Sequence, residues 1–65
     1  MARKIIRPET VSEKTGIALG TLAYWRHRDE GPKSFKLGRR VAYFEDDVDA
    51  WIEQQAAATS VGGAA

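Results

Sequence analysis

Apolar residues near the start of the chain fit one short amphipathic helix. Pro8 suits the first turn of a helix, and Gly16 is the usual kind of residue just past a helix end. The pattern therefore predicts a first helix that begins near Pro8 and stops at Gly16. A helix this short is marginal in isolation, so it must be held by packing, here through Ile6 and Val11.

A second helix is predicted from roughly Leu19 to Arg28, because Leu22 and Trp25 are three residues apart and share one face. Two short helices separated by a tight turn that contains glycine form the helix-turn-helix pattern. The face turned away from the core is polar, aromatic and basic and is expected to enter a DNA groove; it carries Thr21, Tyr24, Arg26, His27 and Arg28. Gly20 either begins this helix or allows a close backbone approach from outside.

The segment after the second helix predicts a β-hairpin. Residues 29–32, Asp-Glu-Gly-Pro, break the helix, and apolar residues then alternate with polar or small ones on both sides of Gly38; they are Phe35, Leu37, Val41 and Tyr43. A lone hairpin is at best marginally stable, so its apolar side is expected to lie on the helices. The basic side chains would project from the other side as a wing: Lys36, Arg39 and Arg40.

A third helix is predicted over residues 45–55, where Val48, Trp51 and Ile52 form an apolar stripe that Phe44 extends. Its first turn is crowded with acids, namely Glu45, Asp46, Asp47 and Asp49. A metal or acid-base site is one interpretation, but the helix dipole and capping favour acids at a helix start without either. Residues 56–65 carry no charge and are interpreted as a disordered tail.

Length and composition restrict the class of protein. The 65 residues allow one domain, and the absence of cysteine excludes a disulfide framework and a thiolate zinc site. The chain contains no run of about 18 apolar residues and no secretory signal at its start, so we expect a soluble cytoplasmic protein.

Charge is strongly segregated along the chain. Up to Phe44 there are ten basic and four acidic residues, a net charge of +6, and from Glu45 onward there are five acidic residues and no basic one. This asymmetry favours a polyanionic partner such as duplex DNA, although a merely solvated basic surface is the alternative. The basic N-terminal arm (residues 1–5, with Arg7 beyond it) is expected either to add phosphate contacts through Arg3, Lys4 and Arg7 or to remain a frayed terminus.

The single histidine and the two tryptophans have alternative interpretations. His27 lies between two arginines, which favours solvated surface or a phosphate contact over catalysis. Trp25 and Trp51 could stack on single-stranded bases, but their helical spacing from other apolar residues favours the core. No set of nucleophile, base and orienting group is present, so an enzyme is not expected.

These elements carry a resemblance that covers roughly Ile6 to Gln54. It rests on PETVSEKTGI at residues 8–17, TLAYWR at 21–26, GP at 31–32, KLGRRVAY at 36–43 and DVDAWI at 47–52. In these segments the chain resembles the small MerR-like winged-helix group, which includes phage excisionases and AlpA-like regulators. The resemblance implies a mostly α fold with a small β-hairpin wing, a single winged helix-turn-helix domain over residues 6–55.

The resemblance also implies which residues contact DNA. The second helix would enter the major groove with Thr21, Tyr24, Arg26 and Arg28, and the wing would follow the backbone or a minor groove with Lys36, Arg39 and Arg40. Three positions depart from the family: Ala18 replaces the usual serine cap of the recognition helix, Thr15 replaces a buried leucine, and Ser12 replaces an alanine. These changes predict a missing cap and a loosely packed first helix.

Three functions follow as hypotheses. The favoured one is an excisionase that binds arrayed sites, bends DNA and directs an integrase toward excision, with neighbouring copies and the integrase as partners besides double-stranded DNA. The others are a small AlpA-like transcriptional regulator and a protein-interaction module whose basic face meets an acidic partner. A metal- or drug-sensing MerR regulator is disfavoured, because those proteins carry a long dimerisation helix after the winged domain and none is seen here. We expect no cofactor, metal, membrane or small-molecule ligand.

Overall fold

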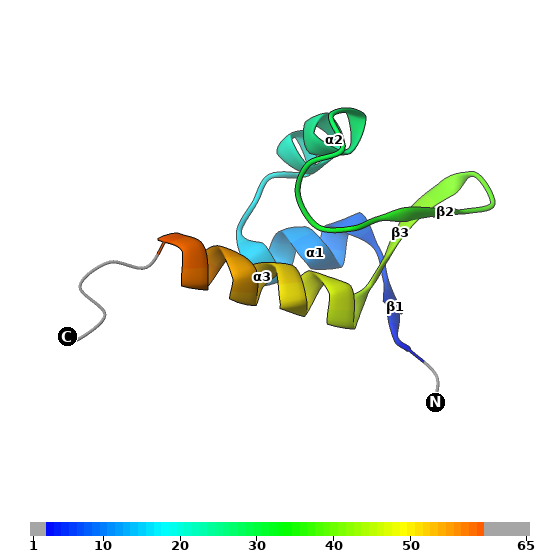
Figure 1. Ribbon diagram of the computed structural model, residues 1–65. Coiled ribbons are helices and arrows are strands. Elements are labelled where there is room, and N and C mark those ends of the chain that lie inside the picture. The colour runs from blue at the N-terminus through cyan, green and yellow to red at the C-terminus, as the bar shows by residue number, and fades with distance from the viewer. Residues whose placement is uncertain (1–2, 60–65) are drawn as a thin grey trace.

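The computed structural model describes residues 3–59, which form three helices and a three-stranded sheet. In chain order the elements are β1 (Ile5–Ile6), α1 (Pro8–Thr15), α2 (Leu19–His27), β2 (Phe35–Leu37), β3 (Arg40–Phe44) and α3 (Glu45–Thr59). In Figure 1, α2 lies above α1 and α3, and the β2–β3 hairpin projects to the right of the helices.

Helix α1 begins and ends where the sequence predicts. Pro8 occupies its first turn, and Gly16 follows it in the left-handed conformation (φ 75°), with its N–H bonded to the Ser12 carbonyl. The hydroxyl of Ser12 donates to the Ile17 carbonyl at 2.6 Å, and that of Thr15 donates to the Val11 carbonyl at 2.7 Å. Both hydroxyls thus make hydrogen bonds at the C-terminal end of α1 and in the turn that follows it.

The N-cap residue of helix α2 is Ala18, and no side-chain hydrogen bond caps the helix there, as the sequence predicts. It ends one residue before the expected boundary, with Arg28 as its C-cap. Asp29 follows with a φ of 55°, and the Glu30 N–H donates to the Trp25 carbonyl at 2.8 Å. Leu22 is buried and Trp25 packs against the core, as predicted.

Strand β3 lies between the other two strands in an antiparallel sheet of order β1-β3-β2. The two-residue β1 was not predicted: Ile5, assigned to the N-terminal arm, pairs with Phe44, and Ile6 pairs with Tyr43. The Glu45 N–H also donates to the Lys4 carbonyl at 2.8 Å, so the backbone of the arm adjoins the start of α3.

The two strands of the hairpin present their apolar residues to opposite faces, which corrects the predicted arrangement. Phe35 is paired with Ala42 and Lys36 with Val41, and residues directly opposite each other share a face. Phe35 and Leu37 therefore lie on the sheet face opposite Val41 and Tyr43, where Phe35 stacks on Phe44 at 4.7 Å and Leu37 is 51% exposed. Lys36 shares the face of Val41, not the face expected for a projecting wing.

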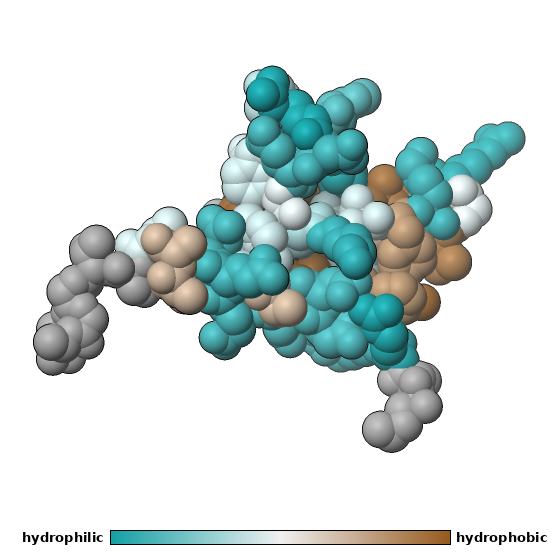
Figure 2. Space-filling model, viewed as in Figure 1, coloured by the Kyte–Doolittle hydropathy of each residue, from teal (hydrophilic) through white to brown (hydrophobic). Residues whose placement is uncertain are grey.

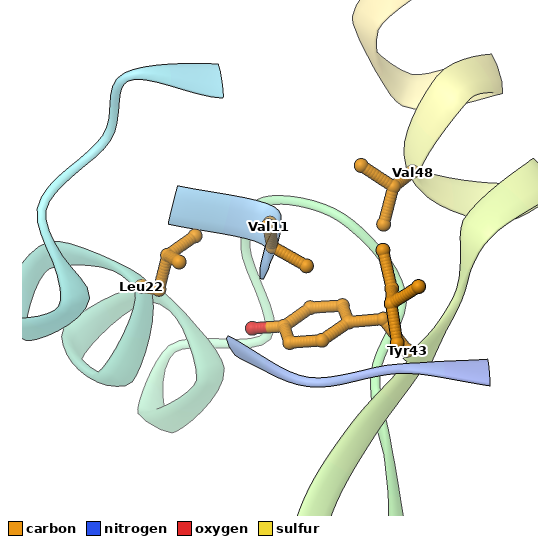
Figure 3. Packing of buried hydrophobic residues seen from close by; sticks show 5 residues of the cluster. Val11, Leu22, Tyr43 and Val48 are labelled. Atoms are coloured by element: carbon orange, nitrogen blue, oxygen red, sulfur yellow. The ribbon is translucent and has the colours of Figure 1, made fainter. Parts of the chain in front are cut away.

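The core joins α1, α2, β1, β3 and α3. Figure 3 shows the ring of Tyr43 below Val11, with its hydroxyl directed toward the part of the chain that carries Leu22. Val11, Leu22, Tyr43 and Val48 are each at most 1% exposed. Trp25 and Trp51 contact each other with ring centroids 5.8 Å apart, which agrees with the interpretation of both as packing residues.

Helix α3 continues to Thr59, four residues past the predicted end. Residues 56–58 are alanines, which have the highest helix propensity, and the Thr59 hydroxyl donates to the Gln55 carbonyl at 2.7 Å. The predicted disordered tail is thus helical over its first four residues, and its remaining residues, 60–65, lie outside the described part of the chain.

The arrangement of two helices around a glycine turn, followed by a hairpin and a closing helix, is the predicted winged helix-turn-helix. Two segments of it are exposed together: the outer side of α2 and the hairpin, here called the wing (residues 35–44). Figure 2 shows hydrophilic side chains over α2 and over the tip of the wing.

Candidate nucleic-acid interface

A groove of about 410 Å³ separates α2 from the wing. We call it the helix–wing groove. It is lined by three residues of α2, one from the loop before β2, and three from the two wing strands: Ala23, Arg26, His27, Ser34, Phe35, Lys36 and Val41. Three of the side chains are basic, and none of the lining residues is acidic.

Three of the predicted contact residues therefore meet in one place. Arg26 and His27 come from the last turn of α2, and Lys36 comes from β2. Lys36 reaches the groove because its register with Val41 puts it on the face of the sheet nearest the helices. A polyanion lying in this groove would be flanked by positive groups from two elements.

The side chain of Arg26 is oriented by a hydrogen bond to a core residue. Its Nη1 donates to the Tyr43 hydroxyl at 2.9 Å, in a partly buried contact. Tyr43 is only 1% exposed, so its ring is fixed by the core. The guanidinium is thus oriented before any ligand arrives, and orientation in advance lowers the entropy lost on binding.

A second, smaller hollow of about 230 Å³ adjoins the N-terminus of α1; we call it the arginine hollow. Arg26 lines it as well, together with Arg7, Pro8, Glu9, Arg40 and Val41. Arg7 Nη1 donates to the Val41 carbonyl at 3.1 Å, which holds the Arg7 side chain against β3. Arg26 thus lies between the two hollows.

The acids of α3 are paired with basic residues remote in sequence. Arg3 Nη2 lies 2.9 Å from Asp46 Oδ1 and 2.9 Å from Asp47 Oδ2, and its guanidinium carbon lies 3.8 Å from the Phe44 ring centroid. Its hydrogen bond to Asp46 raises the pKa of Arg3, and the same bond lowers the pKa of Asp46. Arg3, predicted to contact phosphate, is engaged by these acids in the structure.

Lys14 has the same role on the other side of α3. Its Nζ lies 3.0 Å from Asp49 Oδ1 and 3.4 Å from Glu45 Oε2. The hydrogen bond to Asp49, and secondarily that to Glu45, raises the pKa of Lys14. These acids of α3 lie outside the helix–wing groove, whose lining contains no carboxylate.

The remaining predicted residues of α2 lie outside both hollows. Thr21 is exposed, and Tyr24 is 58% exposed. Arg28 Nη1 donates to the Tyr24 hydroxyl at 3.2 Å, while its Nε lies 3.4 Å from Glu30 Oε2. Arg28 is therefore shared between an aromatic neighbour and an acid at the end of the helix.

Gly20 and Arg39 occupy open surface at the two edges of the interface. A Cβ at Gly20 would meet nothing within 4 Å, so the fold itself does not require glycine there. Arg39 lies in the turn between β2 and β3 and is exposed, as is Arg40 at the start of β3. Lys4 is exposed as well, beside the paired strand β1.

Sequence reasoning missed the residues that complete the groove. Ala23 and Ser34 line it but carry no charge that would single them out, and Tyr43 was assigned to packing alone. The one available signal was the position of Ala23, a small residue one turn before His27 on α2. A small side chain at that position keeps the helix side of the groove open.

Residues 3–59 offer neither a metal site nor a membrane span. His, Cys, Asp and Glu side chains nowhere gather there in a group of three that could hold a metal ion. Among the same residues, no helix has the length and apolar content needed to cross a membrane.

Comparison with known families finds a match to the model described as a helix-turn-helix domain, over residues 6–56. The match spans α1, α2, the wing and most of α3. No curated protein and no solved structure shows significant similarity to the chain.

Proposed function

We propose that this chain, which belongs to the helix-turn-helix domain family, is a sequence-specific duplex-DNA-binding protein that acts as an excisionase. Membership of the family supports a DNA-binding protein. The observation that carries the proposal further is the helix–wing groove, whose lining contains Arg26, His27 and Lys36 and no acid.

The proposal places one sugar-phosphate strand of the duplex in the helix–wing groove. The major groove of B-DNA is wide enough to admit an α-helix, so α2 can approach base edges with its exposed side. A DNA strand that borders the major groove would then pass between α2 and the wing, where Lys36 and Arg26 face it. Neutralising phosphates with such side chains releases counterions and gives an affinity that falls with salt.

Contacts to base edges are assigned to the exposed side of α2. Thr21 and Tyr24 are uncharged there and can form hydrogen bonds or apolar contacts, and Arg28 adds a bidentate donor. Arg39 at the wing tip is assigned to the backbone or to a minor groove, where arginine recognises shape as well as charge. Arg3 supplies at most a secondary contact, because it is already paired with Asp46 and Asp47. The exposed Lys4 is assigned to the DNA backbone.

The excisionase role rests on the resemblance to that group and on this two-sided grip. A protein that holds one strand between a helix and a wing restrains the local path of the duplex, and bends at neighbouring sites add. Arrayed copies would in that way shape an attachment site for an integrase. A transcriptional regulator using the same surface on a single operator is the competing function.

The test is a gel-shift titration on a few hundred base pairs around the encoding locus, at two salt concentrations, with a circular-permutation assay of bending. A ladder of cooperative, salt-sensitive shifts with bending on an attachment-site fragment supports the proposal. A single shift over a promoter without bending assigns the chain to regulation. No salt-sensitive shift on any fragment contradicts DNA binding through this surface and favours an acidic protein partner.

Matched variants separate the two kinds of contact. Arg39→Ala should weaken binding to all sequences and reduce the slope of log K against log salt by about 0.9 for each phosphate that Arg39 neutralises. Thr21→Ala should instead reduce the preference for the cognate duplex over a scrambled one. Lys14→Ala removes one charge that Asp49 and Glu45 already neutralise, so it serves as the control and should change neither quantity.

A further inference from the structure

The arginine hollow brings together three guanidinium-bearing residues from separate parts of the chain. Arg7 precedes α1, Arg26 lies in the last turn of α2, and Arg40 begins β3. Like charges repel, so a fold gathers them at some cost unless an anion completes the site. None of the ion pairs found among residues 3–59 involves any of the three.

Two of the three side chains are fixed by the protein itself. Arg7 donates one N–H to the Val41 carbonyl, and Arg26 donates one to the Tyr43 hydroxyl. A guanidinium carries several N–H donors in a rigid plane, so each keeps others for a ligand after one is used. Neutral acceptors thus set the orientation of both groups and leave their charge uncompensated.

We propose that Arg7, Arg26 and Arg40 bind a single backbone phosphate of duplex DNA in this hollow, and that Tyr43 is the positioning residue for Arg26. This inference rests on the proposed DNA-binding function. It assigns Arg26 to the backbone, whereas the sequence suggested a contact with base edges. Arginine is suited to the site because its planar group donates two parallel hydrogen bonds to a phosphate.

The position of Arg26 gives the phosphate its place along the strand. Because Arg26 lines both hollows, a strand in the helix–wing groove continues into the arginine hollow without leaving basic surface. The hollow would therefore fix the register of the protein on the duplex, and the exposed side of α2 would select the sequence.

Glu9 also lines the hollow and opposes an anion there. Its side chain is exposed and it has no ion pair with the arginines of the hollow, so it limits phosphate affinity without closing the site. Replacing Glu9 by glutamine should then tighten binding to any duplex by a few fold, at low salt more than at high salt. Glu9→Gln would also tighten the binding of an acidic peptide, so the probe must be DNA.

The experiment is ethylation interference on a duplex that the wild-type protein selects from a random pool. Ethylation neutralises one phosphate at a time, and one that occupies the hollow should weaken wild-type binding about tenfold, the scale of a charge-assisted hydrogen bond. Arg40→Gln is the first variant, because Arg40 is exposed and its side chain makes no hydrogen bond or ion pair with the rest of residues 3–59. Lys14→Gln is the charge-matched control.

Tyr43→Phe tests the positioning role separately from folding. The ring and its packing remain, so thermal unfolding should change little, while the hydrogen bond to Arg26 is removed. We expect the interference at that one phosphate to decrease and the preference for the selected sequence to persist. If Tyr43→Phe lowers only the thermal stability and leaves the interference pattern unchanged, Tyr43 has a packing role alone.

The proposal is supported if one phosphate is sensitive in the wild type and in Lys14→Gln but insensitive in Arg40→Gln. It is overturned if every sensitive phosphate stays sensitive in Arg40→Gln and in Arg7→Gln, while binding to the selected duplex persists. That second outcome leaves the DNA-binding function intact. A wild-type protein that selects no duplex at all would refute the function and the site together.

Discussion

Gly31 combines a left-handed backbone with a close approach to an aromatic ring. Its φ is 77°, and a Cβ built there would lie 2.7 Å from Trp25 Cε3 and 3.4 Å from Trp25 Cβ. Trp25 in turn contacts Trp51 of α3. Gly31→Ala therefore strains the loop after α2 and pushes on the tryptophan that joins α2 to α3.

The expected loss of unfolding free energy in Gly31→Ala has two parts, one from the backbone and one from the clash with Trp25. Gly38→Ala measures the backbone part alone. Gly38 has a φ of 67° but nothing within 4 Å of its Cβ position, so Gly38→Ala carries the backbone cost alone. A left-handed conformation costs a non-glycine residue about 1–2 kcal/mol, from which about 0.4–1 kcal/mol is recovered through the less flexible unfolded chain. Overpacking against Trp25 adds about 1–3 kcal/mol at Gly31.

Gly31→Ala should therefore lower the free energy of unfolding by about 3 kcal/mol and Gly38→Ala by about 1 kcal/mol. A core of this size rarely supplies more than about 3–5 kcal/mol, so the first variant would be barely folded. Urea unfolding followed by tryptophan fluorescence measures both, since Trp25 and Trp51 are the two tryptophans of the chain. Equal destabilisation of the two variants would refute the argued clash.

Two further predictions concern capping and pH. Ala18→Ser should raise the free energy of unfolding by about 1 kcal/mol, because Ala18 leaves α2 without a side-chain cap. The midpoint of thermal unfolding should rise by about 4–8 °C. An unchanged midpoint would contradict the capping argument. The hydrogen bond from Arg3 lowers the pKa of Asp46 in the folded state, so the pair stabilises the fold above the ordinary aspartate pKa of 3.8 and loses this effect as pH falls through the lowered value. The stability difference between the parent and Arg3→Gln should accordingly shrink on acidification below pH 3.8, and a difference that grows there would show that the sign is wrong.

The helices could be predicted because their signals are local. Pro8 and Gly16 delimit α1, and the spacing of Leu22 and Trp25 identifies the buried side of α2. The extra turn of α3 escaped prediction because uncharged alanines near a chain end resemble a disordered tail as much as a helix. Strand β1 escaped because two residues are too few to show any alternation.

The wing shows why a period-two pattern is not sufficient. Phe35 and Leu37 alternate correctly within their strand, but the turn fixes which residue they oppose. Because Leu37 pairs with Arg40, the phase of β2 relative to β3 is the reverse of the one expected. That register places Lys36 in the groove and leaves Leu37 exposed.

The candidate site was predictable in composition but not in geometry. Basic residues in α2 and the wing are visible in the sequence, whereas the contacts that orient them join distant positions. Arg26 and Tyr43 are 17 residues apart, and Arg7 and Val41 are 34 apart. The pairing of Arg3 with Asp46, 43 residues away, likewise became evident only in the folded chain.

The most direct test of the central claim, that one strand of the duplex passes through the helix–wing groove, is a titration of the ¹⁵N-labelled protein with a selected duplex followed by amide NMR. The account predicts that the largest shift changes fall on the groove residues Ala23, His27, Ser34 and Lys36, with Glu53 on α3 unaffected. Changes concentrated on α3 or around the exposed Leu37, with no shifts at the groove residues, would contradict it.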